Sequence, residues 1–211
     1  MYYITYGEFQ AHMKSYYQRT GNRMQFPEMT AYLYQKGLLY ETPPAPDLND
    51  DYDTMTDEEF DKVVDSLPLS VSTYGNAPLP ATVQENALIP NARDVFIIRH
   101  PRYTRPYTHR HNYFEINYVV SGQGKFIFEN EERMMHEGEL CIIAPSSEHD
   151  MLIEDDSTVF TICIRQSTFD TTFFSLMSRK DLLSFFFRTI LQGDNHANYL
   201  LFFTADNLPL K

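Results

Sequence analysis

The sequence is short of residues that several classes of protein require. It has no Trp, only 2 Cys, and 17 Lys and Arg against 29 Asp and Glu, for a formal net charge of −12. The two cysteines lie in apolar runs, which favours buried thiols in a reducing cytosol over a disulfide. The acidic balance argues against direct binding to nucleic acid, because phosphate contacts require a basic surface.

Membrane and targeting signals are also missing from the sequence. No apolar run approaches the roughly 20 residues that a helix needs to cross a bilayer. The stretch Met1–Thr5 contains no basic region followed by apolar residues, so no signal peptide is expected. We also find no Gly-rich phosphate loop, nucleophile elbow or Cys-rich zinc ribbon. A soluble, cytoplasmic protein with no membrane partner is therefore expected.

What the sequence does have is enough apolar material for a core. Hydrophobic residues make up 43% and aromatic residues 15% of the chain, with 16 Phe and 15 Tyr. Residues 1–85 are expected to form a helical extension and a linker. Helices are predicted to start at a capping box of Thr5 and Glu8, at Pro27 and at Thr56.

The pattern of apolar and polar residues changes twice after this extension. Residues 86–165 contain short apolar runs separated by polar turns, a pattern typical of an antiparallel barrel or jelly roll. Residues 166–211 return to a helical period, which predicts helices at 167–177 and 181–192, followed by a last apolar segment. The run Phe185–Phe187 places aromatics on more than one helix face, so this helix either packs on the barrel or forms part of a homodimer interface.

One constellation of polar residues stands out in the barrel region. Residues 109–121 are expected to form one strand, whose alternation places four side chains on one face. The candidate site consists of His109, His111, Tyr113 and Glu115, joined by His149 from a second short motif. Three imidazoles and a carboxylate suit a divalent metal such as Zn, Ni, Fe or Mn. The same groups could instead hydrogen-bond one another or line a polar ligand pocket.

The remaining histidines and the nearby arginines are not expected to take part in binding or catalysis. Surface or structural roles are predicted for His12, His100, His136 and His196, with His100 in a loop beside Pro101. A solvated rim, rather than an anion-binding one, is predicted for Arg99, Arg102, Arg105 and Arg110.

The spacing of the constellation resembles the first motif of the cupins. His109-x-His111-x3-Glu115-x6-Gly122 matches that motif, although Tyr103 stands in place of its leading glycine. The stretch 138–149 is similar to the second motif in a degraded form. The resemblance covers about residues 93–165 and implies a double-stranded β-helix, or jelly-roll, barrel.

A narrower resemblance is to the N-terminal sensor domains of AraC-type transcription regulators. It rests on His-x-His-x-x-Phe-Glu-Ile (109–116), Val-Val-Ser-Gly-x-Gly (119–124), Glu-Gly-Glu-Leu-Cys-Ile-Ile-Ala-Pro (137–145) and His149. The resemblance implies a barrel that binds an effector and following helices that mediate dimerisation. It also implies a C-terminal domain with two helix-turn-helix units, which this chain, expected to be truncated, does not contain.

The sequence therefore predicts a mainly β cupin barrel with an N-terminal helical extension and C-terminal helices. Its expected role is effector sensing and dimerisation in an AraC-type regulator, without catalysis and with no required cofactor. The effector is expected near His109, His111, Tyr113, Glu115 and His149. A metal-dependent cupin enzyme, an oxygenase or isomerase that uses His109, His111, Glu115 and His149 as ligands, is the alternative. A sugar- or acid-binding module without regulatory output is a third reading.

Overall fold

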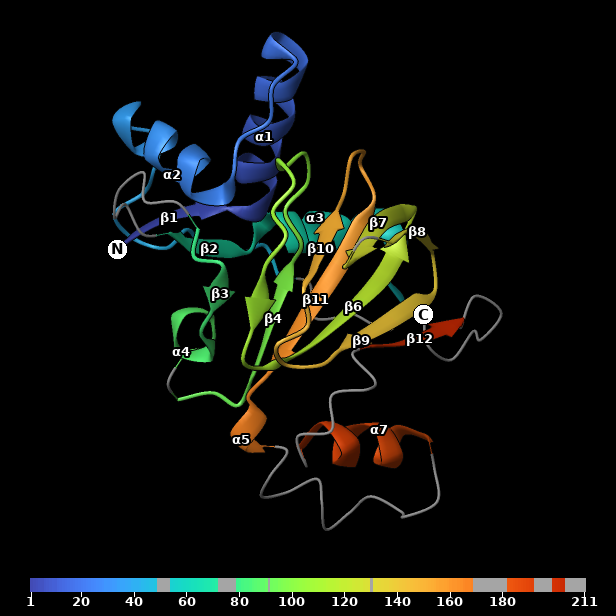
Figure 1. Cartoon of the computed structure of the whole chain (residues 1–211). Helices are drawn as coiled ribbons and strands as arrows, with labels where there is room; N and C mark the ends of the chain where they lie inside the picture. Colours follow the sequence, from blue (N-terminus) through green and yellow to red (C-terminus); the bar gives the residue numbers. More distant parts are fainter. Residues whose placement is uncertain are drawn as a thin grey trace. The chain divides into compact units, whose positions relative to one another are not determined.

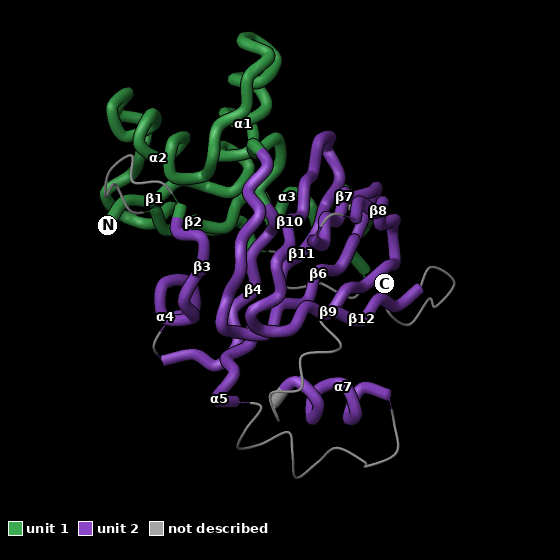
Figure 2. Tube along the Cα trace, viewed as in Figure 1, with its two compact units in different colours: residues 1–79, 101–105 green, residues 80–100, 106–211 purple. Residues whose placement is uncertain are grey.

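The computed structural model describes residues 1–48, 54–71, 79–90, 92–129, 131–168, 182–191 and 199–203. The chain divides into two compact units, which are described separately (Figure 2). The N-terminal unit comprises Met1–Leu79 together with Pro101–Arg105, and the second unit comprises Pro80–His100 and Pro106–Lys211.

The N-terminal unit contains helices at the positions that the capping signals predict. Its elements are β1 (Tyr2–Thr5), α1 (Tyr6–Thr20), α2 (Phe26–Gln35), α3 (Asp57–Ser66) and β2 (Pro68–Val71). The capping box of Thr5 and Glu8 starts α1, and a second one of Thr56 and Glu59 starts α3. The antiparallel pair β1–β2 was not predicted, so the expectation of a purely helical region is incomplete.

A small apolar core holds this unit together. Its buried members are Ile4, Phe9, Met13, Met29, Leu33, Val71 and Tyr103. Tyr103 belongs to the segment Pro101–Arg105, which follows the first barrel strand in sequence but is part of the N-terminal unit.

The second unit is built on two antiparallel sheets (Figure 1). Strands β12, β9, β6, β11 and β4 form the five-stranded sheet in that order, and β10, β7 and β8 form the three-stranded one. The strands are β4 (Val95–Arg99), β6 (Phe114–Ser121), β7 (Gln123–Phe128), β8 (Glu131–His136), β9 (Glu139–Ile143), β10 (His149–Leu152), β11 (Thr158–Ile164) and β12 (Tyr199–Phe203). Because the chain passes repeatedly from one sheet to the other, the predicted jelly-roll barrel is confirmed.

A short segment before β4 also belongs to this unit. It contains β3 (Thr82–Val83) and α4 (Glu85–Leu88), and β3 pairs in parallel with β5 (Arg110–His111). Ile89 at the end of this segment is completely buried beside Tyr113 and Cys163.

The two faces of β6 explain how the barrel is organised. Val119 faces the interior cluster between the sheets, whereas Phe114 and Ile116 belong to an outer cluster with α7 (Leu182–Leu191). Glu115 and Asn117 alternate with these outer residues and are buried on the inward face. The helix predicted at 181–192 is confirmed for the described residues. Most of the helix predicted at 167–177 lies outside them, after the short α5 (Gln166–Thr168).

The strand that carries the first motif is interrupted. The prediction of one continuous strand over residues 109–121 is wrong, because β5 ends at His111 and β6 begins at Phe114. At this break the Asn112 side-chain oxygen accepts a 2.6 Å hydrogen bond from the Glu85 amide at the start of α4. The Asn112 side chain therefore binds the start of α4, and Asn112 lies outside both strands.

Candidate functional site

A narrow antiparallel bridge brings the two histidine motifs together. The His109 amide donates to the His149 carbonyl at 3.0 Å, and the His149 amide donates to the His109 carbonyl at 3.0 Å. The two rings are consequently close, with centroids 4.7 Å apart. The turn before His149, at residues 145–148, presents this histidine as the sequence predicted.

Backbone carbonyls fix the orientation of all three imidazoles. The Nδ1 atom of His109 lies 3.0 Å from the Tyr107 carbonyl, that of His111 2.8 Å from Tyr113, and that of His149 3.1 Å from Ser147. A carbonyl oxygen only accepts, so each Nδ1 must carry the proton. In the neutral ring the Nε2 lone pair then remains available to a ligand or a cation.

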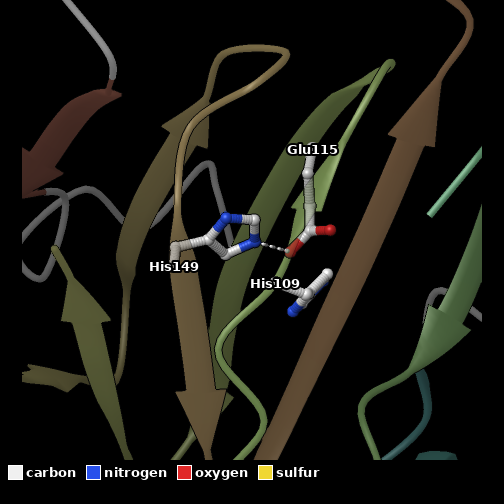
Figure 3. Close-up of side chains that lie close together, drawn as sticks. All are labelled: His109, Glu115 and His149. Carbon is white, nitrogen blue, oxygen red and sulfur yellow. Dashed lines mark ion pairs between the residues drawn. The ribbon is translucent and has the colours of Figure 1, made fainter. Parts of the chain in front are cut away.

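Glu115 lies where these rings converge. Its carboxylate oxygens are 3.4 Å from Nε2 of His111 and 3.5 Å from Nε2 of His149. Figure 3 shows Glu115 facing His149 and His109, and the ligand atoms of these three residues lie within 4.8 Å of one another. Tight charge-assisted hydrogen bonds are shorter than the contacts to His111 and His149. The spacing of Glu115, His111 and His149 therefore leaves room for an ion or a polar group of a ligand between these side chains.

A relay of buried side chains orients the carboxylate. Thr161 Oγ1 donates to Asn117 Oδ1 at 2.6 Å, and Asn117 Nδ2 donates to Glu115 Oε1 at 2.9 Å. Asn117 is fully buried and lies on β6 opposite Thr161 of β11. The sequence analysis missed this relay, although the i, i+2 spacing of Glu115 and Asn117 could have indicated it.

The electrostatic balance favours an ionised Glu115. Burial opposes ionisation, but the adjacent His149 and His111 imidazoles hold the pKa of Glu115 well below its usual range. Burial tends to lower the pKa of His149, yet the contact with Glu115 outweighs it and raises this pKa. Burial lowers the pKa of His109, and it lowers that of His111 to about 4. The polar layer formed by these four residues thus presents a carboxylate and the neutral imidazole lone pairs of His109 and His111, with His149 paired to Glu115.

Tyr113, the fifth predicted site residue, occupies a different environment. Its ring stacks on His111 with centroids 4.1 Å apart, and its other neighbours are the apolar Ile89 and Cys163. Along the inward positions of the chain, Tyr113 precedes Glu115 and Asn117, and Val119 follows them. The polar layer therefore lies between two apolar clusters, where electrostatic interactions are strong because little water screens them.

A divalent cation fits the donor set of this layer. The Nε2 atoms of His111 and His149 are buried without a hydrogen-bond partner, and both face the Glu115 carboxylate. Unsatisfied buried polar atoms are costly, so a bound group that engages them would be favoured. His109, Glu115 and His149 would be the first ligands, with His111 beside them.

The arginines near the motif differ in exposure and in their partners. Arg99 is buried on β4 and donates to Thr158, and Arg110 forms an exposed ion pair with Glu148. Arg102 and Arg105 belong to the N-terminal unit. The expected solvated setting is therefore wrong for Arg99 and confirmed for Arg105 and Arg110. Among the described residues, no helix is long and apolar enough to cross a membrane.

The geometry and topology define a cupin-type barrel with a polar layer of histidines and a carboxylate. Residues 92–176, less than half of the chain, match the family model of the AraC-like ligand binding domain. This segment is therefore similar to the AraC-like ligand-binding domains, and the resemblance inferred from the motifs is confirmed.

The similar solved structures match about a third of this chain. A cupin-2 domain protein from Shewanella frigidimarina is 18% identical with a TM-score of 0.30, over 34% of this chain and 69% of that one. KdgF from a Halomonas species is 24% identical with a TM-score of 0.29, over 33% and 67% of the two chains. DMSP lyase DddQ from Ruegeria pomeroyi is 18% identical with a TM-score of 0.30, over 34% and 36%. A search of curated proteins finds no match.

The relay that orients Glu115 gives a testable stability effect. Thr161→Val keeps the side-chain shape but removes the donor to Asn117 Oδ1, leaving a buried acceptor without its partner. The free energy of unfolding is expected to fall by about 1–3 kcal/mol, measured by urea denaturation. Thr189→Val is the matched control, because its hydroxyl donates to a carbonyl on the exposed side of α7. Equal effects of the two substitutions would contradict the role given to Thr161.

Proposed function

We propose that this chain carries the effector-sensing domain of an AraC-type transcription regulator, with a small molecule bound at the polar layer of the barrel. One observation carries the proposal: the buried Nε2 atoms of His111 and His149 face Glu115 without hydrogen-bond partners of their own. A layer so arranged favours a bound group. The AraC-like match over the same segment supports sensing as the purpose of that binding.

The chemistry of the layer limits what the effector can present to it. Glu115 is ionised, while His109 and His111 are neutral with their Nδ1 protons already engaged by carbonyls. The Glu115 carboxylate and the Nε2 atoms of His109 and His111 are thus acceptors. The effector would offer them hydrogen-bond donors, such as hydroxyl or ammonium groups, and a bare carboxylate would be repelled.

The remaining parts of the proposal concern assembly. We propose that α7 contributes to a homodimer, since Leu182 and Phe185 are 63% and 64% exposed on a helix whose other face packs on the barrel. DNA would be bound through a C-terminal domain outside this chain, and such a regulator would act in the cytoplasm. Effector binding would bias the arrangement of the DNA-binding domains.

A metal-dependent cupin enzyme is the second candidate, favoured by the convergence of His109, Glu115 and His149. Zn, Ni, Fe or Mn would be held by these residues with His111, and the bound ion would act as a Lewis acid toward a substrate. Asn117 would hold the Glu115 carboxylate in position, and the apolar clusters on either side would exclude water. Elemental analysis showing stoichiometric metal, lost in His111→Ala, would favour this candidate over the sensor without metal.

A thermal-shift screen with a metabolite library tests the proposed function. A true effector at 100 times its Kd stabilises the folded protein by about 2.7 kcal/mol, which corresponds to several degrees in Tm. The same compound is expected to give no shift with His149→Ala and a full shift with His136→Ala, an exposed histidine on β8. Compounds that stabilise both variants equally would place binding elsewhere and contradict the proposal.

A further inference from the structure

His100, which the sequence analysis placed in a loop, lies on the inward side of the barrel. Its amide donates to the Val159 carbonyl at 2.8 Å, which continues the β4–β11 ladder beyond the pair Ile98 and Thr161. Alternation puts His100 on the same face as Ile98 and Thr161. Thr161 belongs to the Glu115 relay, and Val159 belongs to the interior cluster. The ring of His100 thus faces the region that contains the polar layer.

The ring of His100 has an unused polar atom. Its Nδ1 is buried without a hydrogen-bond partner, as are the Nε2 atoms of His111 and His149. Burial lowers the pKa of His100 to about 4, and the charges of Glu115, His109 and His149 also act on it. His100 is therefore neutral and electrostatically coupled to the site. His100 is not part of the compact group of His109, Glu115 and His149.

Residues 101–105 lie in the sequence between two histidines of the barrel unit, His100 and His109. After His100, residues 101–105 belong to the N-terminal unit, and the chain re-enters the barrel unit at Pro106. Tyr107 then stacks on His109 with ring centroids 4.8 Å apart and planes 5° apart. The segment 101–105 thus connects two imidazoles of the barrel, His100 before it and His109 after it.

The N-terminal unit holds this segment firmly. Tyr103 is 8% exposed and stacks on Tyr17 with centroids 5.7 Å apart. The Arg102 amide donates to Gln10 Oε1 at 2.9 Å. Arg105 is held three times: its amide donates to the Met24 carbonyl at 3.2 Å, its carbonyl accepts from Gln25 Nε2 at 2.7 Å, and its guanidinium pairs with Glu28 at 2.7 Å.

We propose that His100 is a further ligand-contacting side chain of the barrel site, and that the N-terminal unit positions His100 and His109 through residues 101–105. The ligand in this proposal is the one of the proposed sensing function. The proposal adds a contact residue, His100, and the chain segment that positions it. Nδ1 of His100 meets a hydrogen-bonding group of the bound molecule.

Histidine ring nitrogen spectra of the whole chain test the proposal without any effector. In ¹⁵N-labelled protein, Glu115→Gln is expected to move the His100 ring signals together with those of His109 and His149, while those of His12 and His136 stay in place. An unmoved His100 would overturn its place in the site.

The positioning part is tested with the same spectra on Tyr103→Ala. The signals of His100 and His109 are expected to move, and those of His149 with them through its backbone bridge to His109, whereas those of His111 are expected to move little because the Tyr113 carbonyl holds its ring. Tyr16→Ala, which removes a ring that contacts Tyr32 in the same unit, is the control and should leave all four in place. If Tyr103→Ala does not fold, Arg105→Ala replaces it, since that side chain is half-exposed.

The outcomes separate this proposal from the sensing function. Unmoved His100 and His109 signals in the loop variants would overturn the positioning role while leaving effector binding intact. Conversely, the absence of an effector in a screen would leave the spectral result unaffected, because the spectra report on the protein alone.

Discussion

Glu115→Gln is expected to lower the affinity of the barrel for Zn²⁺ by about 100-fold or more, because changes even to groups behind the metal ligands cost 10–100-fold. The substitution removes the only carboxylate in the group of His109, Glu115 and His149. The substitution also introduces a hydrogen-bond donor into the site. The Gln oxygen would accept from Asn117 as Glu115 Oε1 does, which turns the new amide NH₂ toward the Nε2 lone pair of His111.

Calorimetric titration with Zn²⁺, and with any effector found by screening, measures this loss. Glu139→Gln is the matched control, because Glu139 is also a buried carboxylate that accepts a backbone hydrogen bond, from the His136 amide at 2.9 Å. Wild-type affinity in Glu115→Gln for both Zn²⁺ and the effector would show that the convergent geometry around Glu115 is not a binding site.

Phe186→Ala is expected to reduce the free energy of unfolding by about 3–5 kcal/mol. Phe186 is 1% exposed and packs with Phe114, Ile142 and Ile164 between α7 and the five-stranded sheet. Phe185→Ala, one residue away, is the matched control: Phe185 is 64% exposed, so its loss should change stability by less than about 0.5 kcal/mol. Urea denaturation of both variants tests the packing, and comparable losses would contradict it.

The same pair of variants tests the proposed dimer. If α7 contributes to a homodimer, Phe185→Ala should weaken self-association in sedimentation experiments, although it leaves the monomer stable. Wild-type self-association in Phe185→Ala, or a wild-type protein that remains monomeric at high concentration, would count against an interface at this helix.

The barrel could be predicted from sequence because its strands are short, apolar and separated by polar turns. Runs such as Leu140–Ile143 and Thr158–Ile164 are strands in the structure, and the helix caps at Thr5 and Thr56 are where the side-chain pattern placed them. These are local signals, set by alternation and by hydrogen bonds three residues apart. The structure confirms them for that reason.

The errors arose where the structure depends on distant contacts. The strand break between His111 and Phe114 follows from Asn112 binding the amide of Glu85, 27 positions away. His100 lies just after the end of β4, as expected for a residue beside Pro101, but its amide bond to the Val159 carbonyl decides where its ring lies. The segment 101–105 was expected to continue the barrel region, and its contacts with residues 10–28 place it in the N-terminal unit. Periodicity within one segment cannot reveal such pairings.

Part of the site could be predicted because alternation along a strand is a local signal. Alternation correctly suggested that His109, His111 and Glu115 would converge, since β5 and β6 are extended on either side of the break. Tyr113 faces the apolar residues Ile89 and Cys163 as well as His111, because the break changes the course of the chain at that position. The relay from Thr161 through Asn117 joins two strands 44 positions apart and required the sheet register.

The central claim, a sensor that binds a small molecule at the polar layer and leaves it unchanged, is tested most directly by equilibrium dialysis against a metabolite mixture. Mass spectrometry then identifies what is retained and in what form. We expect the wild-type protein to retain a donor-bearing compound that is recovered chemically intact, and Glu115→Gln to retain none. Conversion of the compound into a product, or equal retention by Glu115→Gln, would contradict the account.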